Sequence, residues 1–415
     1  MKLRVMYMVH SIPKYEKSGT PVAAWRISNR LKDNNKIDVG FIIPTPDGKV
    51  GKEIVDDIPI YRVKKIDFHE NFFHDDKINR EEYLKQLEEA INEFEPDILH
   101  IYNFVFGSYQ TLVLKEKFKK LKIVRSTTHT EDICFCVDPM INNCGKMEYC
   151  NGPKAIMKCA QHYNMIYNGN NYDELVKYIS KHLIYIEDLQ NRYVDKFIFT
   201  TEPFAKHILK YLDIPKNKIE IVPHGIDKYE KFNFRDNNKN FCFIGGTNER
   251  KGLDVLIKAI EENGDILEKY SLNIIGNISE NEIASKLKKL KKQYNEKINI
   301  LGVVSEEEKN KLMQQADFVI LPTYFETYNI VLREVLYFDT PVITTKTFGS
   351  DIIEDDVNGF KINIGDYSKL GKLLYKIAFD DKFLERLQEG AKNTYIDVLD
   401  NECNNILNIY INTVL

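Results

Sequence analysis

The chain has 415 residues, 43% of them hydrophobic, and a formal net charge of −4. This length predicts two or three domains with full cores, and the slightly acidic balance argues against nucleic acid as the main partner. No apolar run reaches the length of a membrane span, and the first residues read as a strand rather than a signal peptide. Seven cysteines without an export signal indicate a reducing compartment. The expected location is cytoplasmic, with peripheral attachment to the inner face of a membrane left open.

The first elements are a strand, a loop and a helix. Arg4–Val9 is an apolar run, and a polar loop follows that ends in Gly19. Thr20 and Pro21 have the residue types of a helix cap and first helical position. The chain therefore opens with the order that begins many α/β domains.

Strands then alternate with helical patterns along the rest of the chain. In the first half the predicted strands are 37–43, 59–63, 97–102, 122–125, 196–200 and 218–222. In the second half they are 241–244, 271–275, 298–301, 318–321, 341–344 and a last one near residue 360, followed by helices from about 367 to 415. Alternation of this kind predicts parallel sheets with helices on both faces. The polar run 228–239 between the halves is the predicted linker.

Two adjacent cations mark the first loop of the second half. Gly245 and Gly246 follow the strand 241–244, and Arg250 and Lys251 stand just before a helix. The positive end of the helix dipole repels cations, so their placement is explained if an anion binds there. Arginine can grip two phosphate oxygens and lysine adds a point charge. These residues predict a phosphate site.

Two glutamates mark a later turn. The strand 318–321 leads through a polar turn into a helix, with Glu326 before the helix and Glu334 within it. Asn329 or Thr327 could cap the helix start. Open α/β sheets bind ligands at such strand ends, and the helix start favours an anion. Two carboxylates here could bind two hydroxyl-bearing parts of one ligand, with a phosphate between them.

The Glu326-x7-Glu334 spacing and the order of elements resemble the retaining GT-B glycosyltransferases, family 4 in particular. The resemblance implies an α/β protein of two Rossmann-like, doubly wound parallel-sheet domains that face each other across a cleft. Residues 1–227 would form the acceptor-side domain with a cysteine-rich insert at 130–165, and 228–239 the linker. Residues 240–398 would form the nucleotide-sugar domain, and the helix 399–415 would pack back on the first domain.

The same resemblance implies the reaction. A sugar would move from a nucleotide-diphosphate donor to an envelope polysaccharide, glycolipid or other glycoconjugate, with retention of configuration and without a catalytic metal. The implied catalytic residues are Arg250 and Lys251 on the diphosphate, Glu326 on the donor sugar, and His129 near that sugar. The implied donor-binding residues are Glu334 on the ribose and the backbone at Gly19, Gly245, Gly246, Tyr328, Asn329 and Ile330.

Five of the seven cysteines lie between Cys134 and Cys159. Cys159 and His162 have the spacing of metal ligands, and Cys150 with Cys136 or Cys134 could complete a tetrahedral structural zinc site. Our candidate ligand set is Cys136, Cys150, Cys159 and His162. The alternative is a loop of reduced cysteines, some of them buried as small apolar residues.

Other functions remain compatible with the sequence. A sugar-nucleotide epimerase or a sugar phosphorylase could use the same architecture and the same residues. An inactive binding or scaffold subunit with a metal-holding cysteine loop is an alternative from a different class. The lysine-rich helix predicted at 284–297 could be a membrane patch, although its amphipathic pattern favours a solvated face.

Overall fold

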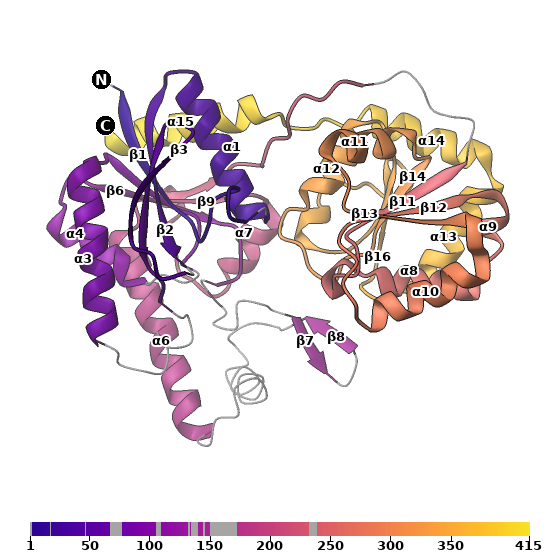
Figure 1. Ribbon diagram of the computed structural model, residues 1–415, viewed down its shortest axis with the longest axis horizontal. Coiled ribbons are helices and arrows are strands. Elements are labelled where there is room, and N and C mark those ends of the chain that lie inside the picture. The colour runs from indigo at the N-terminus through magenta and orange to yellow at the C-terminus, as the bar shows by residue number, and fades with distance from the viewer. Residues whose placement is uncertain are drawn as a thin grey trace. The chain divides into compact units, whose positions relative to one another are not determined.

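The computed structural model describes residues 2–16, 18–45, 47–66, 77–104, 109–131, 133, 140–143, 146–149, 172–231 and 239–415. The chain divides into two compact units (Figure 1). One contains Met1–Gly225 together with Leu399–Leu415, and we call it the N-terminal domain. The other contains Ile226–Val398 and is the C-terminal domain. Among the described residues, none of the helices combines the length and the apolar composition that crossing a bilayer requires.

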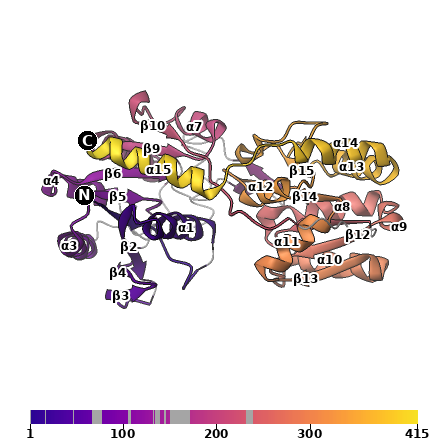
Figure 2. The same ribbon diagram turned by 90° about the horizontal axis from the view of Figure 1, so that it is seen from above.

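The N-terminal domain is built on an eight-stranded sheet in the order β10-β9-β6-β5-β1-β2-β4-β3, which Figure 2 shows from one edge to the other. All neighbouring strands are parallel except β3 and β4. The strands are β1 Leu3–Met8, β2 Ile37–Thr45, β3 Gly51–Val55, β4 Ile58–Lys64, β5 Ile98–Ile101, β6 Lys122–Thr127, β9 Lys196–Phe199 and β10 Ile219–Ile221, with a separate antiparallel pair β7 Met140–Asn143 and β8 Lys146–Tyr149. The helices are α1 Gly19–Asp33, α3 Lys77–Phe94, α4 Leu114–Lys117, α6 Tyr172–Tyr193, α7 Glu202–Ile208 and α15 Leu399–Val414.

The strand β3 is absent from the sequence-based prediction. It pairs antiparallel with β4 through a two-residue turn, Asp56-Asp57, in which both residues have positive φ (49° and 61°). This is the sign pattern of a type I′ hairpin turn, which usually contains Asn-Gly or Asp-Gly. An Asp-Asp pair is an unusual occupant, so the sequence carried little signal for the hairpin.

The C-terminal domain has a six-stranded, all-parallel sheet in the order β13-β12-β11-β14-β15-β16. Its chain order runs outward from β11 on one side and from β14 on the other, as in the Rossmann fold. The strands are β11 Asn240–Ile244, β12 Ser271–Ile275, β13 Ile298–Gly302, β14 Phe318–Leu321, β15 Val342–Thr345 and β16 Gly359–Ile362. The helices are α8 Leu253–Glu262, α9 Ile266–Lys269, α10 Glu282–Tyr294, α11 Glu306–Gln315, α12 Ile330–Tyr337, α13 Tyr367–Phe379 and α14 Asp381–Lys392.

Buried residues, most of them apolar, form the central strands of this sheet. All four residues of β14 and of β15 are buried, as expected for parallel strands covered by helices on both faces. Leu332, Val335 and Leu336 of α12 pack on this sheet, because their spacing places them on one side of the helix. The prediction of two α/β domains with mainly parallel sheets is confirmed.

The last helix, α15, belongs to the core of the N-terminal domain. Its residues Cys403, Ile406 and Tyr410 lie in the same buried cluster as Val5 and Tyr7 of β1. The chain therefore returns to its first domain after it has completed the second. The buried apolar face of α15 accounts for this return.

A buried chain of hydrogen bonds also joins α15 to the sheet. The Nδ1 atom of His100 lies 2.6 Å from the hydroxyl of Tyr410, and its Nε2 atom lies 2.8 Å from the hydroxyl of Ser126. The Tyr410 hydroxyl lies 3.1 Å from that of Tyr7. Burial lowers the pKa of His100 to about 3 from its ordinary 6.5, so the ring is neutral near pH 7.

The stability of the protein should therefore decrease in acid. As the pH falls below 6.5, the unfolded chain binds a proton at His100 before the folded chain does, since the folded pKa is about 3. Stability linked to His100 is complete above pH 6.5 and decreases by roughly 2 kcal/mol between pH 7 and pH 5. His100→Gln should reduce this difference in the free energy of unfolding, measured with urea. Tyr410→Phe keeps the titrating ring, so it should lower stability at both pH values and keep the difference.

Candidate functional site

The C-terminal domain has its topological switch point between β11 and β14. These neighbouring parallel strands continue the chain in opposite directions across the sheet. The loop after β11 carries Gly245, Gly246, Arg250 and Lys251, and the loop after β14 carries Glu326. Ligands of open α/β sheets bind at the carboxyl ends of strands at such a point. The structure therefore brings both predicted loops to the edge where a ligand is expected.

Glycines allow the first of these loops to pack tightly. Gly246 has a φ of 60°, and a Cβ there would lie 2.0 Å from the carbonyl oxygen of Asn277. Gly252 has a φ of 75°, and a Cβ there would lie 2.0 Å from the carbonyl oxygen of Pro322. No other residue type fits such contacts without a backbone shift. The second contact places the start of α8 directly against the β14 loop.

Hydrogen bonds join the two loops at Arg250. Its carbonyl oxygen accepts from the backbone N–H of Tyr324 and from the Thr323 hydroxyl, both at 2.8 Å. The Tyr324 hydroxyl also donates to Asp254 of α8 at 2.7 Å. The Arg250 guanidinium carbon lies 5.7 Å from the centroid of the Phe325 ring. The backbone that carries the two cations is thus held against the glutamate-bearing turn.

Each predicted glutamate has a lysine partner. Glu326 forms an ion pair with Lys251, so the structure brings together two of the predicted residues. Glu334 is buried, with a side chain 6% exposed, and its Oε2 lies 2.9 Å from Nζ of Lys309 in α11. Lys309 was not predicted. No spacing rule connects it to Glu334, because α11 and α12 meet only through packing.

Asn329 caps the helix that follows. It has a φ of 57°, and its side-chain oxygen accepts from the backbone N–H of Leu332 at 3.2 Å. Of the two predicted caps, Asn329 is therefore the correct one. The backbone N–H groups at Ile330 and Val331 belong to the first turn, where a helix supplies no acceptor of its own. Together with the dipole they favour an anion at this point.

The donor-site residues predicted in the N-terminal domain are Gly19 and His129. The placement of Gly19 in a loop is wrong: it is the first residue of α1, and the cap position is Ser18. A Cβ on Gly19 would meet nothing within 4 Å, so close packing does not require a glycine there. His129 follows β6 and lies in the sequence between Arg125 and Glu131, which form a fully buried ion pair. The Glu131 carboxylate also accepts a hydrogen bond, at 3.1 Å, from the backbone N–H of Phe104, which follows β5.

The four predicted zinc ligands, Cys136, Cys150, Cys159 and His162, lie outside the described residues. Within the ranges that the structure describes, no group of three or more His, Cys, Asp or Glu side chains could hold a metal ion. Two thiols are described, Cys242 and Cys403, and both are buried. Burial raises the pKa of each to about 12, so neither is a reactive nucleophile. The zinc site stays a prediction.

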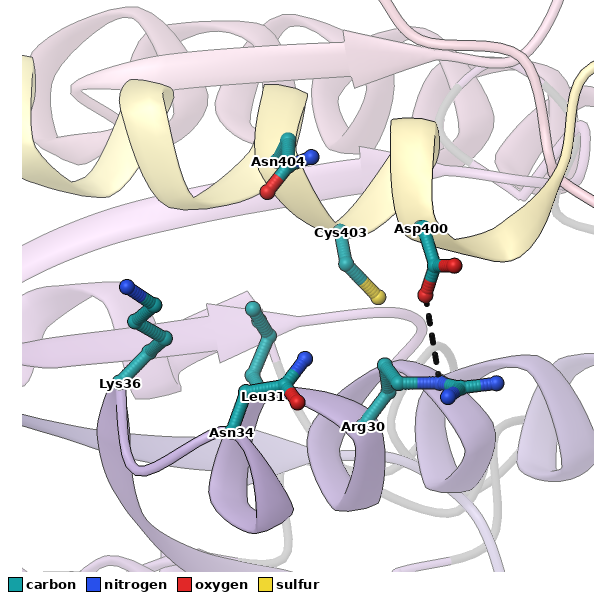
Figure 3. A pocket seen from close by; sticks show the side chains of 7 residues that line it. All are labelled: Arg30, Leu31, Asn34, Lys36, Asp400, Cys403 and Asn404. Atoms are coloured by element: carbon teal, nitrogen blue, oxygen red, sulfur yellow. Dashed lines mark ion pairs between the residues drawn. The ribbon is translucent and has the colours of Figure 1, made fainter.

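A polar pocket of about 340 Å³ lies between α1 and α15 in the N-terminal domain (Figure 3). Asp400 at the start of α15 lies 3.5 Å from the guanidinium of Arg30 near the end of α1. The end of α1 leads directly into β2, so this pocket lies at the amino ends of the strands. Ligands of open sheets bind at the opposite edge, and we therefore regard the pocket as a solvated seam between two helices. Its lining residues are Arg30, Leu31, Asn34, Lys36, Asp400, Cys403 and Asn404.

Family models match both halves of the chain. The model for glycosyl transferases group 1 matches residues 226–394, and the model for glycosyltransferase family 4 matches residues 17–229, more than half of the chain. An uncharacterized glycosyltransferase of Methanocaldococcus jannaschii is 24% identical over 233 residues, covering 51% of this chain. The match takes in 59% of that relative, so the chain spans about three fifths of its length.

Solved structures resemble the chain over nearly its full length. Sucrose-phosphate synthase from Thermosynechococcus elongatus aligns with a TM-score of 0.69 and 11% identity, over 99% of both chains. HepE of Anabaena, in complex with UDP, aligns with a TM-score of 0.67 and 13% identity, over 99% of this chain and 100% of that one. At these identities the likeness establishes the fold, which is the predicted pair of Rossmann-like domains.

Proposed function

The chain belongs to glycosyltransferase family 4, and from this membership we propose that it transfers a sugar from a nucleotide-diphosphate donor with retention of configuration. A carbohydrate or lipid-linked molecule is the proposed acceptor. One observation carries the proposal: Lys251 contacts Glu326 at the switch point, while the neighbouring Arg250 is hydrogen-bonded through its backbone to the same turn. Positive and negative side chains meet there, beside the start of a helix. A sugar diphosphate presents the complementary mixture of anionic oxygens and hydroxyl groups.

The two cations are proposed to hold the diphosphate. During transfer the bond from the anomeric carbon to the diphosphate oxygen breaks, and a bond to the acceptor oxygen forms on the same face. The acceptor proton passes to the departing diphosphate. Negative charge grows on the leaving group, and preorganised charges such as Arg250 and Lys251 stabilise it. Because these cations and the start of α12 balance that charge, the proposal assigns no catalytic metal.

The two glutamates are proposed to bind hydroxyl groups of the donor. Without a donor, Lys251 neutralises Glu326. A bound diphosphate carries more charge than one carboxylate, so it attracts Lys251 and leaves Glu326 to accept hydrogen bonds from the sugar. Glu334, deeper in the domain and held by Lys309, is assigned to the ribose. His129 and the backbone at Gly245 and Gly246 keep their predicted roles in this proposal.

The experiment begins with binding. We expect one of UDP, GDP, ADP or dTDP to raise the melting temperature of the purified full chain, because the proposed site recognises a diphosphate. The corresponding nucleotide sugars are then incubated with candidate acceptors, and NMR of the product reports the anomeric configuration. Transfer should persist in EDTA, and no stabilisation by any of the four diphosphates would contradict the proposal.

The same incubations separate the rival functions. An epimerase converts the nucleotide sugar without an acceptor, and a phosphorylase requires inorganic phosphate. A scaffold subunit would bind no nucleotide diphosphate. Elemental analysis of the same preparation tests the predicted structural zinc, with about one zinc per chain expected if four ligands close a tetrahedral site.

A further inference from the structure

Arg333 is a buried arginine beneath the glutamate-bearing turn. It belongs to α12, and its side chain is 5% exposed. The Nη1 atom donates to the carbonyl oxygen of Tyr328 and, at 2.9 Å, to that of Gly349. The Nη2 atom lies 2.6 Å from Oδ1 of Asp351. The guanidinium carbon also lies 3.7 Å from the centroid of the Tyr328 ring, so one side chain holds both the ring and the backbone of that residue.

This arrangement sets the direction of a backbone N–H group. A trans peptide is planar, with its C=O and N–H pointing to opposite sides of the chain. Because Arg333 holds the carbonyl of Tyr328, the N–H of Asn329 points away from the guanidinium. The Asn329 carbonyl oxygen lies 3.5 Å from the same Nη1 atom. For the same reason, the N–H of Ile330 also points away from the guanidinium. Arg333 thus orients the N–H groups of Asn329 and Ile330, at the start of α12, by binding the carbonyl oxygens of the same two peptide groups.

The turn that carries Asp351 supports the same segment. The backbone N–H of Gly349 donates to the carbonyl oxygen of Glu326 at 3.1 Å. A Cβ on Gly349 would lie 2.4 Å from the carbonyl carbon of Tyr328, so only glycine allows this approach. Arg333 therefore stands between two turns, after β14 and after β15, and bonds to both.

We propose that Arg333, held by Asp351, is a positioning residue for donor binding. It keeps the Glu326–Asn329 turn in the one conformation that presents N–H groups to the donor phosphate and the Glu326 carboxylate to the donor sugar. The inference rests on the proposed function of this turn. Asp351 acts through Arg333, and neither side chain is assigned a contact with the donor.

Arginine suits this role for a geometric reason. Its planar fork donates in several directions at once and stacks on an aromatic ring, whereas a lysine ammonium is a single point charge. Burying a guanidinium is costly, and a purely structural site would be served as well by an apolar side chain. The charge and its three carbonyl neighbours are explained if the function of Arg333 is to orient the backbone of this turn and not to fill the core.

The test separates phosphate recognition from general stability. The variants are Arg333→Lys, Arg333→Met and Asp351→Asn. The matched control is Arg386→Met, which breaks an exposed Arg–Asp pair of the same 2.6 Å length, to Asp356, in the same domain. The probe is whichever of UDP, GDP, ADP or dTDP stabilises the wild-type chain most, compared with its free nucleoside, which lacks the phosphates.

We expect both Arg333 variants to bind the diphosphate about tenfold more weakly or worse by calorimetry, and Asp351→Asn to show a smaller loss. Binding of the nucleoside, followed by NMR titration, should change less than about twofold, since Glu334 is untouched. Arg386→Met should match the wild type for both ligands. Circular dichroism and melting temperature establish that each variant is folded.

Two outcomes would overturn the inference. One is a folded Arg333→Met variant whose diphosphate affinity equals that of the wild type. The other is an equal loss of diphosphate and nucleoside affinity, which would indicate general disruption of the domain. Should the wild-type chain itself bind no diphosphate, the proposed function fails, and that result differs from either of these.

Discussion

Lys251→Met lowers sugar transfer by about a hundredfold or more in our expectation, because it removes one preorganised charge from the departing diphosphate. The side chain forms an ion pair with Glu326 beside a backbone that two hydrogen bonds hold in place. Methionine keeps most of the apolar stem, so the change removes mainly the charge. The rate of product formation at saturating donor measures the effect, and the loss should appear in kcat as well as in kcat/KM.

The control for this prediction is Lys239→Met. Lys239 also forms an ion pair in the C-terminal domain, with Asp381 at 2.7 Å, but that pair is largely exposed. Exposed pairs contribute little, so this variant should retain wild-type transfer. Comparable activity in the Lys251 and Lys239 variants would show that Lys251 does not stabilise the leaving group. Adding Glu326→Gln to Lys251→Met tests whether the two residues act together.

Gly252→Ala is expected to destabilise the C-terminal domain by about 3 kcal/mol or more. Two effects combine at this position. The residue has a φ of 75°, which strains a side chain, and the added Cβ would lie 2.0 Å from the carbonyl oxygen of Pro322. The β14 loop must then move away from α8, which also separates Arg250 from its hydrogen-bond donors. Urea unfolding measures the loss, and transfer should decrease along with it.

Gly365→Ala separates these two effects. Gly365 has nearly the same φ, 76°, but a Cβ there would meet nothing within 4 Å. Its replacement should cost only the backbone strain, about 1 kcal/mol. The difference between the two variants isolates the contact with Pro322. If both variants lose the same stability, the close approach of the two loops is not what requires glycine at position 252.

Most strands and helices of the C-terminal domain could be predicted because local sequence patterns indicate them. The strand 318–321 is a continuous apolar run and the strand 271–275 is mostly apolar, and helices with residues at helical spacing follow both. Asn329 has the residue type of a cap at the place where the apolar pattern begins. These patterns depend only on residues a few positions apart in the sequence, so they can be recognised without knowledge of the fold.

Other features had no such local signal. Lys309 and Glu334 lie on different helices, and Arg333 reads in sequence as an ordinary charged residue of a helix. Only packing shows that its side chain points inward, to carbonyl groups of two turns. The hairpin at Asp56-Asp57 was missed because its turn residues are not the usual ones.

The sequence by itself determined the fold class, the alternation of strands and helices, and the residue types at the candidate site, since periodicity and turn chemistry are written in neighbouring residues. Tertiary structure alone decided which charges pair, which glycines permit close contact, and that an arginine lies behind the donor turn. Those facts depend on atoms that meet from distant parts of the chain. Their distances follow from how the helices pack on the sheet and not from any spacing along the sequence.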